Sequence, residues 1–353
     1  MSGHFLLSPL ARDFTLEQVE KMSAARVHEF FVQTRWGKEG KQVCPECGTI
    51  TNHYWVKTRR QWRCRDVACG RSFSVTSGTK WADHKLPLKK LLKAMVIFAT
   101  NVKGVSASAL GRLLSVAYQT AFVLLHKLRE SIMERADKNK LDGLVHIDGA
   151  HVSGRIRKPR VKKKATQTQA RDRVPASANA FHPNRRIVMV LREVDSRDHK
   201  GAIRTIVEVV PAENAEWAKK LADKYVKHGA TVMTDEHPAY TQFAAKFKHA
   251  TVNHSIEFST DDGVNNNHAE SFFSRMRRMV FGQVHRVTPK YMLDYVTEVA
   301  WREDWRRVQT SEQVRSLIRM STYTESNWWR GYWQGKKRPE EIFFARGSAP
   351  APS

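Results

Sequence analysis

The sequence has little of what directs a protein into or across a membrane. No run of 18 apolar residues occurs, so no stretch predicts a transmembrane helix. The first residues, Met1 to Pro9, lack a charged segment followed by a long apolar core, and they make a poor signal peptide. We therefore expect a cytoplasmic protein without a membrane partner.

Acidic residues are scarce relative to basic ones. The 353 residues include 60 Lys or Arg and 35 Asp or Glu, which gives a formal net charge of +25. Such an excess favours a polyanionic partner, most often nucleic acid. A membrane surface is the weaker interpretation, because no basic amphipathic helix stands apart as an anchor. The length allows two or three domains, one of them with a sizeable core.

Cysteine is also rare, and its spacing is informative. The four cysteines form two close pairs, each followed by a glycine: Cys44, Cys47, Cys64 and Cys69. In an intracellular protein such pairs predict a metal site rather than disulfides. Four thiolates suit structural Zn²⁺ and leave no open position for catalysis. We predict a zinc module over residues 41–80; four unrelated buried cysteines are the alternative. Basic side chains around it either contact phosphates or form a solvated face: Lys57, Arg59, Arg60, Arg63, Arg65 and Arg71.

Residues 81–136 have apolar positions at helical spacing and predict three helices. A short helix, a tight turn and a longer helix form the helix-turn-helix pattern, in which Tyr118 and Gln119 would open the recognition helix. Any three-helix bundle has this periodicity, so packing alone is the alternative. Upstream, residues 1–40 predict a small helical segment, with Thr15 as a candidate cap.

After a polar break at 136–143, the pattern becomes α/β. Three strands, a helix, a strand and then alternating helix and strand is the order of an RNase H-like domain, which we place at 143–310. The remainder, 311–353, is a C-terminal extension with a tail expected to be disordered. Its tryptophans either stack on bases or pack in a core. The predicted fold class is multidomain α+β: a zinc ribbon, a helix-turn-helix bundle and an RNase H-like α/β core.

Three acids stand at informative places in this core. Asp148 and Asp235 end predicted strands, and Glu270 lies on a predicted helix. Phosphodiester cleavage uses two divalent ions about 4 Å apart, and Mg²⁺ or Mn²⁺ takes oxygen ligands. We expect Asp148 to bridge both ions, Asp235 to hold one and Glu270 the other. Asn267, one turn before Glu270, is a further candidate as a ligand or as an orienting group. Taken singly, an Asp at a strand end is more often a cap or surface residue.

Two further regions are candidates for DNA contact. Arg277 and Arg278, two turns beyond Glu270, could hold the scissile phosphate or the DNA backbone. The insertion 155–186 between the first two strands is strongly basic and predicts a flexible loop that orders on DNA. A solvated insertion without a role is the alternative. The insertion includes the run Lys162, Lys163 and Lys164.

Together these motifs resemble those of the IS1595 family of bacterial insertion-sequence transposases, with its ISXO2-like DDE-type domain. The resemblance runs from about residue 15 to about residue 335. The segments that carry it are Cys44–Cys69, Arg71–Thr79, Val145–Gly154, Thr234–Tyr240 and Asn267–Arg278. It implies a DNA-binding front end, a catalytic core, cut or copy chemistry at terminal inverted repeats, and association with the nucleoid. Double-stranded DNA would be the partner, bound by a homo-oligomer.

The chain departs from the family pattern at two places. Members carry Asn or Glu at the third catalytic position with a basic residue downstream; this chain has both Asn267 and Glu270, and Arg277 where some members have Lys. We favour Glu270. Many relatives have an acidic residue after the first Asp, where this chain has Gly149. Two other functions stay open: a DNA-binding regulator with an inactive core, which has no reason to keep the three acids, and a nuclease or resolvase, which shares the metal chemistry.

Overall fold

The computed structural model describes residues 4–153, 185–195, 201–252, 266–336, 338 and 340–344. The chain divides into two units. Unit 1 comprises Met1–Ala136 and Trp301–Pro339, and unit 2 comprises Asp137–Ala300 and Glu340–Ser353. Most of the predicted basic insertion, including Lys162, Lys163 and Lys164, lies outside the described residues.

Unit 1 is mainly helical, and side-chain caps begin several of its helices. Thr15 accepts a hydrogen bond from the Gln18 amide, whose side chain binds back to the Thr15 amide, so the expected cap is confirmed. Ser106 caps the first helix of the predicted helix-turn-helix pair in the same way. The elements are η1 (Phe5–Leu7), η2 (Pro9–Arg12), α1 (Leu16–Lys21), α2 (Ala24–Trp36), α3 (Leu88–Thr100), α4 (Ala107–Leu114), α5 (Tyr118–Arg135), α9 (Thr310–Ser321) and η6 (Tyr332–Gln334).

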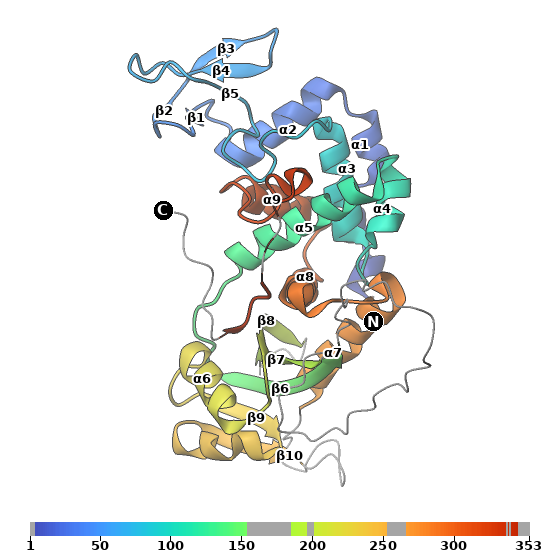
Figure 1. The fold of residues 1–353 in the computed structure, drawn as a ribbon, viewed down its shortest axis with the longest axis vertical. Coiled ribbons are helices and arrows are strands. Elements are labelled where there is room, and N and C mark those ends of the chain that lie inside the picture. The colour runs from blue at the N-terminus through green and yellow to red at the C-terminus, as the bar shows by residue number, and fades with distance from the viewer. Residues whose placement is uncertain are drawn as a thin grey trace, which may run out of the picture. The chain divides into compact units, whose positions relative to one another are not determined.

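Helix α9 returns from the C-terminal part of the chain and packs on α3 and α5 (Figure 1). Its Val314, Leu317 and Ile318 are fully buried in the same apolar cluster as the α3 and α5 side chains. The segment after α9 is held by the buried Lys80 side chain. Its ammonium group lies 2.7 Å from the Glu134 carboxylate and donates to the carbonyl of Glu325. Unit 1 is therefore built from both ends of the chain.

The tryptophans of this unit are mostly used in packing. Trp301 and Trp329 are buried, and Trp329 stacks on His126 at 4.5 Å between ring centroids. Trp333 is 58% exposed. Among the described residues no single helix is long and apolar enough to cross a membrane; α4 and α5 pass that test only as a pair, and they are bent by 113° to each other.

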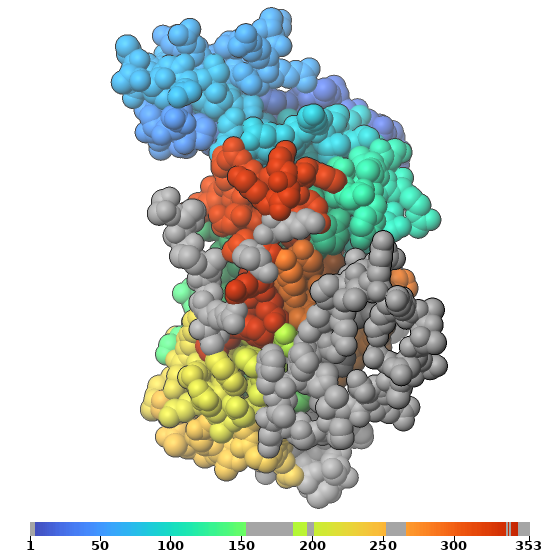
Figure 2. Space-filling view, in the orientation of Figure 1, coloured from blue at the N-terminus to red at the C-terminus, as the bar shows by residue number. Residues whose placement is uncertain are grey.

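Between α2 and α3 lie two small antiparallel sheets that surround the cysteines. The first pairs β1 (Gln42–Val43) with β2 (Ile50–Thr51), and the second has the order β3 (Tyr54–Val56), β4 (Gln61–Arg63), β5 (Ser72–Phe73). Trp62 of β4 lies in contact with Trp36, Trp55 and Phe73, so aromatic rings take the place of a large apolar core. Figure 2 shows this module in light blue, projecting from the other atoms of unit 1.

Unit 2 is built on a five-stranded mixed sheet of order β10-β9-β6-β7-β8. β6, β7 and β8 are antiparallel neighbours, while β9 pairs in parallel with both β6 and β10. The strands are β6 (Leu144–Ser153), β7 (Arg185–Val194), β8 (Ala202–Val210), β9 (Thr231–Asp235) and β10 (Lys248–Val252). The helical elements are α6 (Ala215–Tyr225), η3 (Pro238–Ala245), α7 (Asn267–Met279), the π-helical turn η4 (Val280–Val284), η5 (Pro289–Tyr291) and α8 (Met292–Trp305), which runs into unit 1.

Helices cover both faces of this sheet. Val145 and Ile147 of β6 face the core formed with α6 and η3. The alternate residues of a strand point to the other face, where His146 meets His268 of α7 at 4.9 Å between rings. The sheet therefore presents odd-numbered β6 residues to α6 and even-numbered residues to α7.

Strand β7 begins earlier than the sequence predicts. Arg185 and Arg186 were expected in the flexible basic insertion, yet both belong to the strand. Arg186 is buried and forms a bidentate ion pair with Glu341, with nitrogen–oxygen distances of 2.6 and 2.7 Å. The expectation was wrong for these two residues because a buried ion pair has no local sequence signature.

Candidate active site and zinc-binding cluster

The four cysteine sulfurs converge. Each Sγ lies within 4.8 Å of the others, with Cys44–Cys69 at 3.8 Å and Cys47–Cys64 at 3.6 Å. A tetrahedral Zn²⁺ with Zn–S bonds of about 2.3 Å places its sulfurs about 3.8 Å apart. Positive φ angles at Gly48 (75°) and Gly70 (52°) make the tight turns after each pair. The donor set and its spacing therefore fit a structural zinc ion.

The surface of this module is basic. The six Lys and Arg residues predicted to surround the cysteines are all exposed. Arg65 lies over the ring of Tyr54 at 4.6 Å, and Tyr54 and Trp55 are themselves 58% and 45% exposed. In the described part of the chain, none of the six forms an ion pair with an acid. Such a face combines positive charge with exposed aromatic rings.

Asp148 and Asp235 lie on neighbouring strands of unit 2. Asp235 ends β9 as predicted, but the prediction that Asp148 ends a strand was wrong, because β6 stays paired with β7 as far as Ser153. The parallel pairing of β6 with β9 covers only Leu144–His146 and Thr231–Met233. The two strands part after these residues, and each aspartate stands two positions beyond the last pair. Both carboxylates are half-buried. Their hydrogen bonds are with backbone: Asp148 accepts from the Gly149 N–H at 2.8 Å, and Asp235 accepts from the His237 N–H at 3.2 Å.

Helix α7 lies against β6 and β7 on the face to which Asp148 points. Buried Arg192 of β7 donates to the carbonyl of His268 at 2.7 Å and so holds the first turn of α7. Burial, with the positive charges of His268 and Arg192, lowers the pKa of His146 to about 3, so its ring is neutral beside that turn. These contacts fix where the helix begins.

Glu270 and Asn267 both lie on this first turn, and both are exposed. The carbonyl of Asn266 accepts from the Glu270 N–H at 3.2 Å, which closes the turn. Arg277 and Arg278 are exposed near the end of the same helix. The structure thus brings Asp148, Asp235 and the start of α7 to one region, and it leaves the choice between Asn267 and Glu270 open.

A fourth acid lies here that the sequence analysis did not single out. Glu213 follows β8 and precedes Asn214, the cap of α6. Only 7% of Glu213 is exposed, and its carboxylate accepts from the Tyr240 hydroxyl at 2.8 Å and lies 3.3 Å from the ring nitrogen Nε2 of His151. The one sequence signal that could have pointed to it is Gly149, a glycine inside a strand.

The acids influence one another electrostatically. Burial raises the pKa of Asp148 to about 8, and repulsion from Asp235, Glu213 and Glu270 acts in the same direction. The Gly149 amide acts the other way by donating to the carboxylate. Burial and the charge of Glu213 also raise the pKa of Tyr240 well above its usual value. An ionised Asp148 therefore needs a cation nearby.

The donor set fits divalent metal, although it is looser than the cysteine cluster. In the described chain no Lys or Arg side chain forms an ion pair with Asp148, Asp235 or Glu213. Among the described residues, the cysteines are the one group of three or more metal-binding side chains whose ligand atoms all lie within 4.8 Å of one another. The described acids do not form such a group.

The residues predicted to open the recognition helix have clear positions. Tyr118 and Gln119 are exposed at the start of α5, immediately after the turn from α4.

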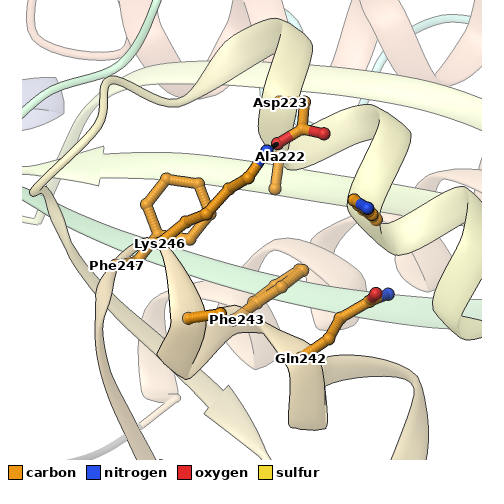
Figure 3. A pocket seen from close by; sticks show the side chains of 8 residues that line it. Ala222, Asp223, Gln242, Phe243, Lys246 and Phe247 are labelled. Atoms are coloured by element: carbon orange, nitrogen blue, oxygen red, sulfur yellow. Dashed lines mark hydrogen bonds and ion pairs between the residues drawn. The ribbon is translucent and has the colours of Figure 1, made fainter.

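A cavity of about 130 Å³ lies between α6 and η3, lined by Phe243 and Phe247 and bordered by the Lys246–Asp223 ion pair (Figure 3). None of the four acids lines this cavity, so it is separate from the candidate active site.

Comparisons with known proteins agree with the resemblance seen in the sequence. The family model described as the ISXO2-like transposase domain of IS1595 elements matches residues 140–304, and the transposase zinc-ribbon domain of the same elements matches residues 22–72. No curated protein sequence matches the chain.

Solved structures with some likeness are transposase complexes. The Mos1 strand transfer complex is 12% identical, covering 73% of this chain and 82% of that one, with a TM-score of 0.25. The Mos1 mariner paired end complex with Mn is 14% identical, covering 94% and 99%, with a TM-score of 0.22. Scores this low do not establish a shared overall arrangement. The two family models together span the cysteine module and the sheet with its acids, and this chain belongs to the IS1595 family of insertion-sequence transposases.

Proposed function

We propose that the chain is a DNA transposase that binds the terminal inverted repeats of its element and cleaves and rejoins DNA strands at a two-metal-ion site. Asp148, Asp235 and Glu270 would hold the ions in an RNase H-like unit. The observation that carries this proposal is a pair of half-buried aspartates just beyond the point where two parallel strands part, Asp148 within β6 and Asp235 at the end of β9, without a basic partner in the described chain. The sheet order and its antiparallel-then-parallel pairing support the RNase H-like assignment.

The chemistry divides between bound ions and protein side chains. When bound, two divalent ions would activate the attacking hydroxyl and stabilise the leaving oxygen. Asp148 would be shared by the ions, with Asp235 on the neighbouring strand and Glu270 on α7 as further ligands. Arg277 and Arg278, two turns further along α7, are exposed and can neutralise backbone phosphates. The anchoring of α7 by Arg192 would keep Glu270 in position.

DNA would be brought to this site by unit 1. The 113° bend between α4 and α5 is within the range of helix-turn-helix pairs, and Tyr118 and Gln119 are exposed where a recognition helix begins. The exposed basic and aromatic face of the cysteine module would add contacts to the backbone. The excess of Lys and Arg over Asp and Glu in this chain supports the same assignment, since it favours a polyanionic partner.

The direct test is to incubate the protein with DNA carrying the element's own flanking inverted repeats and Mg²⁺ or Mn²⁺, and to map nicks and joined products. We expect nicks at the element ends, and loss of more than about 100-fold in cleavage in Asp148→Asn with end binding close to wild type. Nicks without joined products would identify a nuclease. Binding without cleavage under any metal condition would identify a regulator and overturn the proposal.

A further inference from the structure

The carboxylate of Glu213 lies against the backbone of β6, one residue beyond Asp148. A Cβ atom placed on Gly149 would lie 2.4 Å from Oε1 of Glu213 and 3.0 Å from Oε2. No side chain other than hydrogen fits there unless Glu213 moves. Gly149 does not have a positive φ, so its backbone conformation does not require glycine. The glycine is explained by the carboxylate that occupies the space above it.

This carboxylate is held from two sides, by a hydroxyl and by an imidazole ring. Tyr240, fully buried in η3, donates to Oε1 at 2.8 Å, and His151, two residues beyond Gly149, lies 3.3 Å from Oε2. Tyr240 carries no charge, and the His151 side chain is 40% exposed. In the described residues no Lys or Arg pairs with Glu213. A nearly buried carboxylate without a fixed cation is costly, which points to a mobile one.

Glu213 lies close enough to Asp148 for its charge to act on that carboxyl group, although it approaches from the opposite face of β6. Asp148 points to the α7 face of β6, and residue 149 points to the α6 face, where Glu213 lies. Tyr240, which holds Glu213, belongs to η3, the element that follows Asp235 directly. Because β6 is no longer paired with β9 beyond His146, a cation between Asp148 and Asp235 is open to both faces.

We propose that Glu213 is a fourth carboxylate ligand of the active-site metal, reaching the ions from the α6 face while Glu270 reaches them from the α7 face. The inference rests on the proposed function, since it assumes that Asp148 and Asp235 hold divalent metal. Tyr240 and His151 are then positioning residues, because each contacts Glu213 and keeps its oxygens aimed at the strand ends. Gly149 is the position that leaves room for it.

The test measures Mn²⁺ binding to the full-length, zinc-loaded protein without DNA, by calorimetry and by the electron paramagnetic resonance signal of free Mn²⁺. Glu213→Gln retains an oxygen that can accept from Tyr240, so we expect an unchanged melting temperature without added Mn²⁺. The expected result is Mn²⁺ affinity reduced by about 10- to 100-fold. Glu216→Gln is the matched control. Glu216 lies exposed in the first turn of α6, three residues after Glu213, and is paired with Lys220, so this variant should bind Mn²⁺ like wild type.

A second pair of variants tests the contact itself. Gly149→Ala should displace the Glu213 carboxylate and weaken Mn²⁺ binding to a similar degree. In a Glu213→Ala background, where the space is free, Gly149→Ala should add little, so the two changes are not additive. Additive losses, or wild-type Mn²⁺ affinity in Glu213→Gln, would overturn the assignment of Glu213.

The variant Asp148→Asn distinguishes an error in the assignment of Glu213 from an error in the proposed function. If Asp148→Asn weakens Mn²⁺ binding and Glu213→Gln does not, the metal site stands and Glu213 is not part of it. If neither variant changes Mn²⁺ binding, the metal site itself is wrong, and the inference about Glu213 is overturned with it.

Discussion

The cysteine cluster and the acids proposed to bind divalent metal are assembled in opposite ways. The cysteines lie within 26 positions of sequence, from 44 to 69, and their sulfurs are already at the spacing of a zinc tetrahedron. The acids come from two strands, a loop and a helix that are far apart in the chain, and the described acids do not form a comparable cluster. Tight turns can gather thiols locally, whereas the acids depend on the whole sheet and repel one another until a cation joins them.

The largest difference between the two sites should appear when zinc binding is removed. Because the two small sheets have few strands and pack mainly through aromatic rings, we expect Cys64→Ser to unfold residues 41–80. Structural zinc in isolated zinc-finger peptides contributes about 10–16 kcal/mol. Limited proteolysis, together with zinc release measured by a colorimetric chelator, would show cleavage confined to this module. Asp148→Asn is the control and should keep its zinc. A module that stays protease-resistant without zinc would contradict the prediction.

Single substitutions in the acidic site should reduce DNA cleavage and leave the stability of the fold unchanged. We expect Glu270→Ala to reduce Mn²⁺-supported strand cleavage by more than about 100-fold and Asn267→Ala by about 10-fold, since a ligand matters more than a group that orients it. Melting temperatures of both variants should equal that of wild type, because both side chains are exposed. If only Asn267→Ala abolishes cleavage, Asn267 is the third ligand.

The smallest expected effect is a change in stability with pH. The pKa of Asp148 is about 8 in the folded protein and about 3.9 in an unfolded chain. Between these values the folded state retains a proton that the unfolded state has released. The free energy of unfolding should therefore fall as pH rises from about 4 to about 8 when no Mg²⁺ is added.

Thermal unfolding of the zinc-loaded protein at about pH 5 and about pH 8, with and without Mg²⁺, would measure this dependence. Mg²⁺ competes with the proton, so it should raise the melting temperature by a few degrees more at the higher pH. Asp148→Asn should abolish the difference. An equal Mg²⁺ effect at both pH values would show that Asp148 does not lie at the metal.

Local signals made much of this structure predictable. Thr15 and the helix it caps, the cysteine pairs and the strand that ends at Asp235 are each recognisable within a few residues. Glu213 could not be found in this way, because an acid just before the capping residue Asn214 looks like an ordinary helix start. Its importance depends on the contact with Gly149, which is 64 positions away in the chain.

Buried charges were the other feature that sequence patterns missed. The basic composition of residues 155–186 placed Arg186 in a predicted flexible insertion, and no sequence signal near Lys80 indicated that its side chain is buried. Both side chains are buried and paired with acids that are far away in the chain, Glu341 and Glu134. Periodicity indicates which face of an element is apolar, but it carries no information about which charged side chain will find a distant partner.

The construction of unit 1 from both chain ends has a consequence for biosynthesis. Val314, Leu317 and Ile318 fill the same core as helices completed some two hundred residues earlier. While a ribosome is still translating the intervening sheet, that core has an open apolar side, and the helices proposed to contact DNA cannot reach their final stability. A prematurely terminated product would therefore be a substrate for chaperones and proteases rather than a free-standing competitor for the element ends.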